Sequence, residues 1–295
     1  MLVSRTAHGA PPVAIRSGMP AITRRTALFL DFDGTLADLA PQPELVVVPH
    51  DLVALLDELT GQLGGALAIV SGRKMADLDG FLAPLRPPTA AEHGANQRLP
   101  NGELLQKASP RLHDVIRIAQ ALAGEHAGLR VEVKSAAVAL HYRHAPELEM
   151  LCLNTLAEAI KLTPGVELMQ GKFVLEVKPA GVSKGSAMED FMGITPFAGR
   201  VPVFAGDDTT DEAGFAAVQA MGGAGIKVGE GPSLAHHRCA STALLRQWLR
   251  DSLDSLASNK SDDDSGSPVA PEPVALSLQS PGPRPKPPDQ EPFPT

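Results

Sequence analysis

The sequence predicts an α/β protein with a doubly wound parallel sheet, into which a smaller antiparallel α+β unit is inserted. Two observations lead to this fold class. Short apolar runs alternate with amphipathic segments in the first and last parts of the 295 residues, a pattern typical of a parallel sheet with helices on both faces. In the middle of the chain, pairs of alternating segments joined by short turns indicate antiparallel hairpins.

The first predicted strand leads directly into a cluster of acids. Ala27–Leu30 is apolar and is followed by Asp31-Phe32-Asp33-Gly34-Thr35. The run is long enough for a buried strand and too short for a helix. A strand that ends in two carboxylates and a glycine places charge at the carboxyl edge of a sheet, where α/β proteins bind ligands. An ordinary Asp-Gly turn is the alternative, but the combination of strand, Asp-x-Asp and Gly-Thr is more specific.

The following segments continue a strand and helix alternation. Leucines at 52, 55, 56, 59 and 63 lie on one face of a predicted helix. A second buried strand, Ala66–Val70, stops at Ser71 and precedes a predicted helix over Lys74–Leu85. Residues 90–94 close a further short strand.

The inserted unit has a helix, hairpin, helix, hairpin order. We expect a sheet backed by two helices, which cover Arg111–Ala123 and Pro146–Leu162. The first hairpin pairs Arg130–Lys134 with Val138–Arg143, and the second pairs Val166–Met169 with Phe173–Lys178. The parallel pattern then resumes with helix Lys184–Met192, strand Val201–Ala205, helix Asp211–Met221 and strand Gly225–Val228. A last helix covers Leu234–Trp248 or extends slightly beyond.

These patterns predict a domain organisation. Residues 27–107 and 182–257 form the core, 108–181 form an inserted cap, and 1–26 form a flexible lead. The Ser-, Asp- and Pro-rich stretch 258–295 is predicted to be disordered because it cannot bury a core.

Composition restricts the class of partner. The net charge of −8 argues against nucleic acid or an anionic membrane, and no apolar run approaches the roughly 18 residues of a membrane span. Cys152 and Cys239 are too few and too distant for a disulfide framework. We therefore expect a cytoplasmic monomer whose partner is a small molecule.

Chemically useful side chains follow several predicted parallel strands. Asp31 with Asp33, Ser71, Lys184 and Asp207 all fall where the carboxyl ends of strands share one crevice. Asp31 is suited to be a nucleophile because a carboxylate is already ionised at pH 7. Its attack on a phosphate needs positive charge nearby, since like charges repel by roughly 4 kcal/mol per pair. All-oxygen ligands from these acids suit Mg²⁺.

Each of these residues also has an ordinary structural explanation. Ser71 could be a helix N-cap or part of a phosphate cradle, and Lys184 could be an exposed lysine on a first helical turn. Asp208 and Asp211, in the acidic run after the predicted strand Val201–Ala205, could coordinate metal, support the ligands or cap a helix. Crowding with other carboxylates could keep Asp33 protonated as a general acid.

Two further patterns have more than one explanation. Alternation in the cap places Glu132, Lys134, Arg143 and Glu176 opposite an apolar face. A solvated face is the usual explanation, and a polyol-binding lid is the alternative. His236, His237 and Cys239 could suggest zinc, but four ligands are not visible and a loop is predicted there.

Six stretches together resemble the trehalose-6-phosphate phosphatases of the haloacid dehalogenase (HAD) superfamily. They are LFLDFDGTL, AIVSGR, AEHGA, VALHYRHAP, GKFVLEVKPAGVSKGSAM and VFAGDDTTDEAGF, spread over Ala27–Leu249. The resemblance implies a Rossmann-like core with a cap and Mg²⁺-dependent hydrolysis of trehalose 6-phosphate through an aspartyl phosphate, the last step of trehalose biosynthesis.

The resemblance also implies residue roles. It makes Asp31 the nucleophile, Asp33 the acid/base whose backbone carbonyl also binds metal, Ser71 and Lys184 the phosphate ligands, and Asp207 the Mg²⁺ ligand. It assigns the disaccharide to cap residues Glu132, Lys134, Arg143 and Glu176, with Arg73 and His93 near the site. Alternatives are another sugar phosphate, such as sucrose or mannosyl-glycerate phosphate, and a non-catalytic sugar-phosphate sensor. A receiver-type switch lacks both the inserted cap and the D-x-D-G-T motif.

Overall fold

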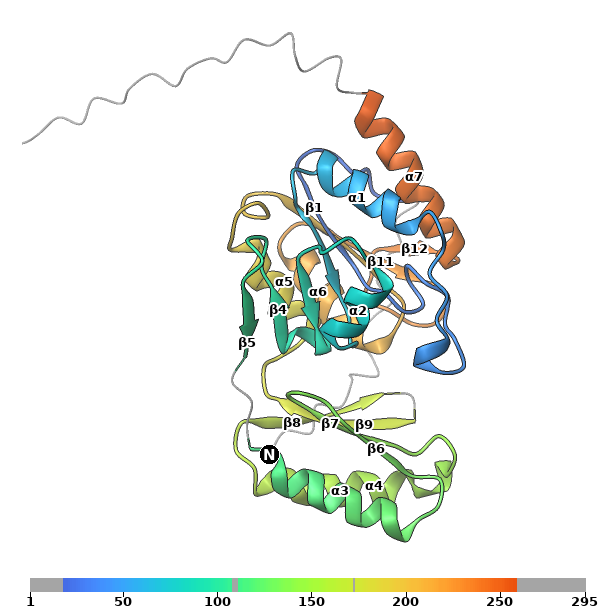
Figure 1. The fold of residues 1–295 in the computed structure, drawn as a ribbon, viewed down its shortest axis with the longest axis vertical. Helices are drawn as coiled ribbons and strands as arrows, with labels where there is room; N and C mark the ends of the chain where they lie inside the picture. The colour runs from blue at the N-terminus through green and yellow to red at the C-terminus, as the bar shows by residue number, and fades with distance from the viewer. Residues whose placement is uncertain (1–17, 108–110, 172, 259–295) are drawn as a thin grey trace, which may run out of the picture. The chain divides into compact units, whose positions relative to one another are not determined.

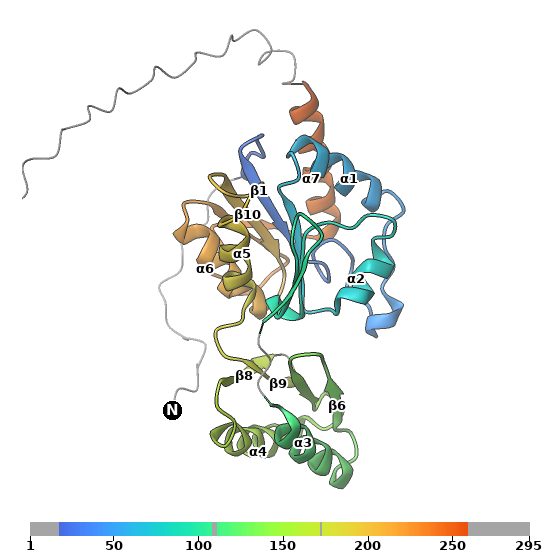
Figure 2. The same ribbon diagram turned by 60° about the vertical axis from the view of Figure 1, so that its left-hand side comes forward.

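Two separate sheets organise the chain (Figures 1 and 2). The computed structural model describes residues 18–107, 111–171 and 173–258. In spatial order, the larger sheet contains β12 (His237–Cys239), β11 (Ala224–Val228), β10 (Val201–Gly206), β1 (Thr26–Leu30), β2 (Leu67–Val70), β3 (Thr89–Ala91), β4 (Asn96–Arg98) and β5 (Leu104–Gln106). All strands from β12 to β3 are parallel, and β4 and β5 are antiparallel.

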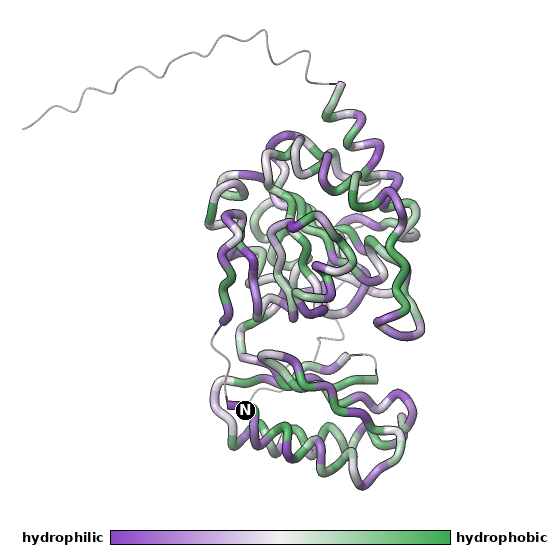
Figure 3. The backbone as a smooth tube through the Cα atoms, viewed as in Figure 1, coloured by the Kyte–Doolittle hydropathy of each residue, from purple (hydrophilic) through white to green (hydrophobic). Residues whose placement is uncertain are grey.

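Helices cover both faces of this sheet. They are α1 (Leu52–Gln62), α2 (Met75–Phe81), α5 (Lys184–Met192), α6 (Glu212–Ala220) and α7 (Thr242–Ser258). Leu28 and Leu30 of β1 belong to one hydrophobic core with leucines of α1, α2 and α7. Ala27 and Phe29 belong to a second core with α5 and α6. Because neighbouring residues of one strand enter different cores, the sheet is doubly wound as predicted, and its central strands are hydrophobic (Figure 3).

The smaller sheet is antiparallel throughout, in the order β6 (Arg130–Val133), β7 (Val138–His141), β9 (Val174–Pro179) and β8 (Val166–Gly171). Leu140, Leu175 and Val177 pack with α3 (His113–Glu125) and α4 (Glu149–Lys161) in a third core, and both helices lie on one face of this sheet (Figure 1). The predicted α+β arrangement, with an apolar face covered by two helices, is therefore present.

Short 3₁₀ helices lie at Pro43–Leu45, Glu92–Gly94, Pro146–Leu148 and Thr209–Asp211. Among the described residues, no helix combines the length and the apolar character needed to cross a membrane.

Several predicted boundaries are wrong. The last helix begins at Thr242 and not at Leu234, because residues 237–239 pair with β11 as an edge strand where a loop was predicted. Helix α2 ends at Phe81, shortly before Pro84, which cannot continue a helix. Strands β4 and β5 were not predicted, since three-residue strands carry too little alternation to recognise.

Residues 1–26 were predicted to form a flexible lead, but the last part of this segment packs against the core. Ile22 is only 6% exposed and belongs to the core that contains Leu28, and Trp248 Nε1 donates a hydrogen bond to the Pro20 carbonyl at 3.2 Å. Residues 1–17 and 259–295, which include nearly all of the predicted disordered tail, lie outside the described residues.

Candidate active site

The central residues of the site follow two adjacent strands. Asp31 is the first residue after β1, and Asp207 is the first after β10. These strands are neighbours at the point where the chain passes from one side of the sheet to the other, which is where open α/β sheets bind ligands. Ligand oxygens of Asp31, Asp207 and Asp211 lie within 4.8 Å of one another. The predicted convergence of acids is therefore present.

Lys184 is the cation that contacts two of these acids. It opens α5, where Ser183 caps the helix by accepting the backbone N–H of Ser186. Its Nζ lies 2.8 Å from Asp31 Oδ1 and 2.6 Å from Asp211 Oδ1. Burial acts to lower the pKa of Lys184, but the negative charges of Asp211 and Asp31 outweigh this effect and raise the pKa. The alternative of an exposed first-turn lysine is wrong, because the side chain is 3% exposed.

The acids themselves carry an excess of negative charge. Burial raises the pKa of Asp31 well above its usual range, with Lys184 opposing and Asp211 and Asp207 adding to the effect. Burial, Asp211 and Asp208 raise the pKa of Asp207 to about 6. Within the described part of the chain, no side chain forms a hydrogen bond or ion pair with the Asp207 carboxylate. This all-oxygen donor set fits a hard divalent cation.

The glycine and threonine after the second aspartate shape the site. Thr35 Oγ1 donates to Asp31 Oδ2 at 3.4 Å and orients the carboxylate. Gly34 has φ +72°, and a Cβ added there would lie 2.1 Å from Asp207 Oδ2. Only glycine combines this left-handed conformation with so close an approach. Thr35 therefore orients the carboxylate of Asp31, and Gly34 leaves room for the carboxylate of Asp207.

Asp33 is held by a cation. Arg73 Nε and Nη2 donate to its two carboxylate oxygens at 2.6 and 2.7 Å, and the guanidinium lies 4.8 Å from the ring centroid of Phe81. Such a bidentate pair fixes the position of the carboxylate. The sequence interpretation considered only other carboxylates as neighbours of Asp33, and the structure adds Arg73 as its direct charge partner.

Ser71 follows β2 and is 1% exposed. Its Oγ accepts the backbone N–H of Arg73 at 3.2 Å. Helix α2 begins only at Met75 with Lys74 as its N-cap, so the N-cap explanation for Ser71 is wrong. The hydroxyl remains able to donate to an anion at the end of its strand.

Asp208 and Asp211 play different parts. Asp208 is exposed and accepts a hydrogen bond from Thr209 Oγ1 at 3.3 Å. Asp211 is fully buried, and its Oδ2 accepts the backbone N–H of Asp208 at 2.8 Å while Oδ1 contacts Lys184. Asp211 therefore supports the loop and the lysine, whereas Asp208 lies outside the group of three ligand acids.

His93 lies at the junction with the cap. Burial and the charges of Lys134, Lys184 and Lys178 lower the pKa of His93 well below its usual range, so the ring is neutral. Its Nδ1 is buried and has no hydrogen-bond partner among the residues that the structure describes. Beside it, Glu92 Oε2 accepts a hydrogen bond from Ser135 Oγ in the β6–β7 turn at 2.6 Å. This contact ties the turn next to Lys134 to the core.

Three of the four predicted cap residues lie together. Lys134 Nζ is 2.7 Å from Glu176 Oε2, and Glu132 and Glu176 both pair in register with Ala139. A hydrogen bond from His141 lowers the pKa of Glu132 to about 2. Arg143 is exposed beyond the end of β7, with its guanidinium 5.8 Å from the Phe173 ring centroid, and is not part of this group.

Comparison with known proteins identifies the family of this chain. Residues 29–247 match the family model described as trehalose-phosphatase. The chain is 42% identical over 258 residues to the trehalose-6-phosphate phosphatase of Escherichia coli (strain K12), covering 83% of this chain and 94% of that protein. The chain belongs to the trehalose-phosphatase family. As a member of this family it is a phosphatase, and the recognition made from the sequence is confirmed.

Solved structures agree with the trehalose-phosphatase fold. A trehalose-6-phosphate phosphatase related protein matches with a TM-score of 0.67 at 29% identity, covering 79% of this chain and 99% of that one. A phosphatase of the haloalkanoate (HAD) superfamily from Bacteroides thetaiotaomicron, 16% identical, matches in fold with a TM-score of 0.54 and covers 85% of this chain and 99% of that one. The HAD fold expected from the sequence is therefore present.

Sequence reasoning missed three residues of this phosphatase site. Thr35 and Glu92 were quoted within motifs without a role. Lys227 was read only as part of a strand, although a lysine at the end of an otherwise apolar, buried strand is a recognisable signal. The zinc alternative finds no support, since the Asp31 cluster is the one group of three potential ligands among the described residues.

Proposed function

We propose that this chain hydrolyses trehalose 6-phosphate to trehalose and phosphate through a phosphoryl group carried on Asp31, as the last step of trehalose biosynthesis. The observation that carries the proposal is the meeting of Asp31, Lys184 and Asp207 at the switch point of the sheet. The named function of the Escherichia coli relative supports the choice of substrate.

Phosphoryl transfer begins at Asp31. One carboxylate oxygen attacks phosphorus, the bond to the sugar oxygen breaks, and the phosphoryl group is left on Asp31. Lys184 and the Ser71 hydroxyl hold the phosphoryl oxygens and offset the charge that develops there. Asp31, Asp207 and the backbone carbonyl of Asp33 would hold Mg²⁺, with Asp208 and Asp211 as further candidate ligands or supports. When bound, Mg²⁺ neutralises charge between nucleophile and phosphate.

Asp33 supplies the proton for the leaving sugar and later removes one from the water that attacks the phosphoryl group. The Arg73 ion pair holds the Asp33 carboxylate in place in the present conformation. We propose that substrate entry breaks this pair and frees Asp33 for proton transfer. Arg73 thereby keeps the acid/base in place between turnovers.

The cap selects the sugar. Glu132, Lys134 and Glu176 offer donors and acceptors of both charges on the face of the sheet opposite α3 and α4, which suits a molecule rich in hydroxyls. His93 adds an unpartnered ring nitrogen beside Lys134. We propose that closing the cap over the substrate excludes water during phosphoryl transfer. The resemblance also assigns Arg143 to the sugar, and in this structure its side chain is exposed beyond the end of β7.

Phosphate release from a panel of sugar phosphates tests the proposal, with and without Mg²⁺. We expect trehalose 6-phosphate to be hydrolysed far faster than sucrose or mannosyl-glycerate phosphates, and chelation to stop the reaction. Comparable rates on several sugars would reject the trehalose assignment. Tight binding of trehalose 6-phosphate without turnover would support a sensor instead.

A further inference from the structure

Lys227 is a buried cation that the proposed mechanism does not use. It lies near the end of β11 and is only 6% exposed. Its Nζ donates to the backbone carbonyl of Asp207 and, at 2.9 Å, to that of Val228. In the described part of the chain, no carboxylate lies within ion-pair distance of this ammonium. A buried charge held only by carbonyls is costly, so its position requires an explanation.

The explanation lies in the peptide that Lys227 contacts. Gly206, the last residue of β10, pairs in register with Lys227 on β11, and Asp207 follows as the first residue beyond the strand. The Asp207 carbonyl therefore takes its hydrogen bond from the Lys227 side chain. The N–H of the same peptide, that of Asp208, donates to Asp211 Oδ2 at 2.8 Å. Both polar groups of the peptide between residues 207 and 208 are thus fixed.

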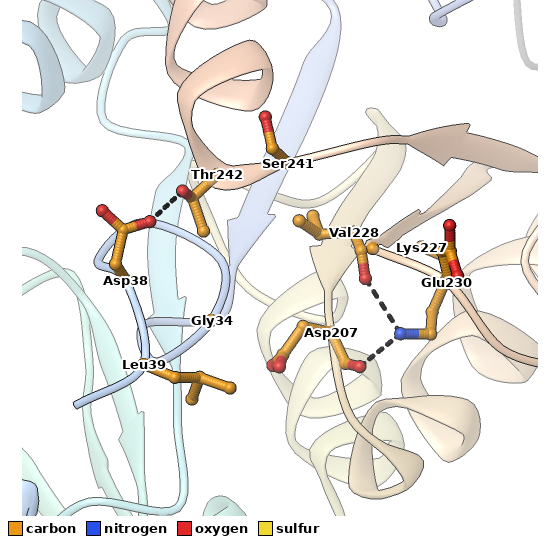
Figure 4. Close-up of a pocket in the computed structure, with 10 residues that line it drawn as sticks. Gly34, Asp38, Leu39, Asp207, Lys227, Val228, Glu230, Ser241 and Thr242 are labelled. Carbon is orange, nitrogen blue, oxygen red and sulfur yellow. Dashed lines mark hydrogen bonds between the residues drawn. The ribbon is translucent and has the colours of Figure 1, made fainter. Parts of the chain in front are cut away.

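Fixing this peptide restrains the backbone from which the Asp207 side chain projects. Figure 4 shows the carbonyl of Asp207 turned toward Lys227 and its carboxylate turned the other way, toward the Gly34 loop. The carboxylate lies so close to Gly34 that a Cβ there would collide with it. The ammonium also adds positive charge beside a group of three acids. Without these two hydrogen bonds, the loop segment that carries Asp207 would lose its restraint next to the acid cluster.

We propose that Lys227 is a positioning residue that clamps the 207–208 peptide and so aims the Asp207 carboxylate at a bound divalent cation. This role rests on the metal site of the proposed function. Groups that orient metal ligands typically change metal affinity or activity by about 10- to 100-fold when removed. Lys227 acts through Asp207 and contacts neither substrate nor phosphate.

Binding of Mn²⁺ to the substrate-free protein, followed by electron paramagnetic resonance of the unbound ion, tests this role independently of turnover. We expect Lys227→Met to weaken Mn²⁺ binding by at least about tenfold, and Lys227→Arg, which keeps the charge and a donor, to lose less. At saturating metal, the KM of Lys227→Met for the sugar phosphate should match that of the unaltered protein.

Lys178→Met is the matched control. Lys178 is another buried lysine whose Nζ donates to a backbone carbonyl, that of Val182, and it lies in the β8–β9 hairpin. Its loss should lower the melting temperature without changing Mn²⁺ affinity. If Lys227→Met does not fold, Lys227→Leu, which also lacks a donor, replaces it with the same expectation. A folded Lys227→Met or Lys227→Leu variant with unchanged Mn²⁺ affinity overturns the inference alone, whereas an unaltered protein that binds no Mn²⁺ overturns the metal site as well.

Discussion

The ammonium of Lys184 lies 2.8 Å from Asp31 Oδ1, and both side chains are almost completely buried. The same ammonium reaches Asp211, so one cation holds two acids that burial would otherwise penalise. A nucleophile in this position is oriented before substrate arrives. It also depends on Lys184 for its ionised state, since burial by itself raises the pKa of Asp31.

Loss of Lys184 should therefore destabilise the fold as well as stop turnover. Lys184→Met leaves Asp31 and Asp211 buried without their cation, which we expect to cost about 3 to 5 kcal/mol in the free energy of unfolding. Urea denaturation of the metal-free protein measures this. Lys161→Met, which breaks an exposed pair with Glu158, is the control and should cost less than about 1 kcal/mol. Equal effects of the two substitutions would contradict the buried-pair explanation.

The pH dependence of stability should report Asp207. Its pKa is about 6 in the folded protein against an ordinary value of 3.8, so the folded state holds the proton more tightly than the unfolded state. This group therefore favours folding most below pH 3.8, and that contribution is lost as the pH rises through about 6. We expect the melting temperature of the metal-free protein to decline across this window.

Asp207→Asn removes the titrating group and should flatten the decline of the melting temperature with pH. In the unaltered protein, saturating Mg²⁺ should raise the melting temperature at pH 7 and thereby also reduce this decline. Thermal denaturation at several pH values, with a chelator or with Mg²⁺, measures both effects. A decline that persists unchanged in Asp207→Asn would assign it to other acids.

Gly34→Ala should displace a metal ligand. The new Cβ would lie 2.1 Å from Asp207 Oδ2, and the backbone has φ +72°, so we expect kcat to fall by about 100-fold and Mn²⁺ affinity by at least about tenfold. Gly61→Ala is the matched control, because Gly61 lies in α1 with open space around it. That change should leave activity intact and, if anything, stabilise the helix. Normal metal binding by Gly34→Ala would show that Asp207 tolerates the displacement.

Cap substitutions should separate sugar binding from phosphate chemistry. Glu176→Gln removes a charge from the Lys134 pair, and we expect KM for trehalose 6-phosphate to rise by about 10- to 100-fold, with hydrolysis of the small ester p-nitrophenyl phosphate little changed. Arg143→Ala, at an exposed position beyond β7, should change KM by no more than about twofold. An Arg143→Ala effect as large as that of Glu176→Gln would place Arg143 in the sugar site.

Much of the fold could be predicted because its signals are local. The Leu52 to Leu59 face of α1 and the apolar run of β1 depend only on periodicity. The start of α7 could not be predicted, since residues 237–239 form a strand only by pairing with β11. The site residues likewise divide into those with a local sequence signal and those that depend on contacts in the folded chain. Motif positions identified Asp31, Lys184 and Asp207, whereas the Arg73 pair with Asp33 and the Lys227 clamp depend on side-chain placement in the folded chain.

Chemical trapping of the phosphorylated carboxylate tests the central claim most directly. The protein is mixed with trehalose 6-phosphate and Mg²⁺, quenched, and treated with borohydride, which reduces an aspartyl phosphate to homoserine. Peptide mass spectrometry then locates the modified residue. We predict homoserine at position 31, absent from Asp31→Asn, which should also lose at least about 1000-fold in turnover. Turnover with no modification at residue 31, or with modification at another carboxylate such as Asp33, would contradict the account.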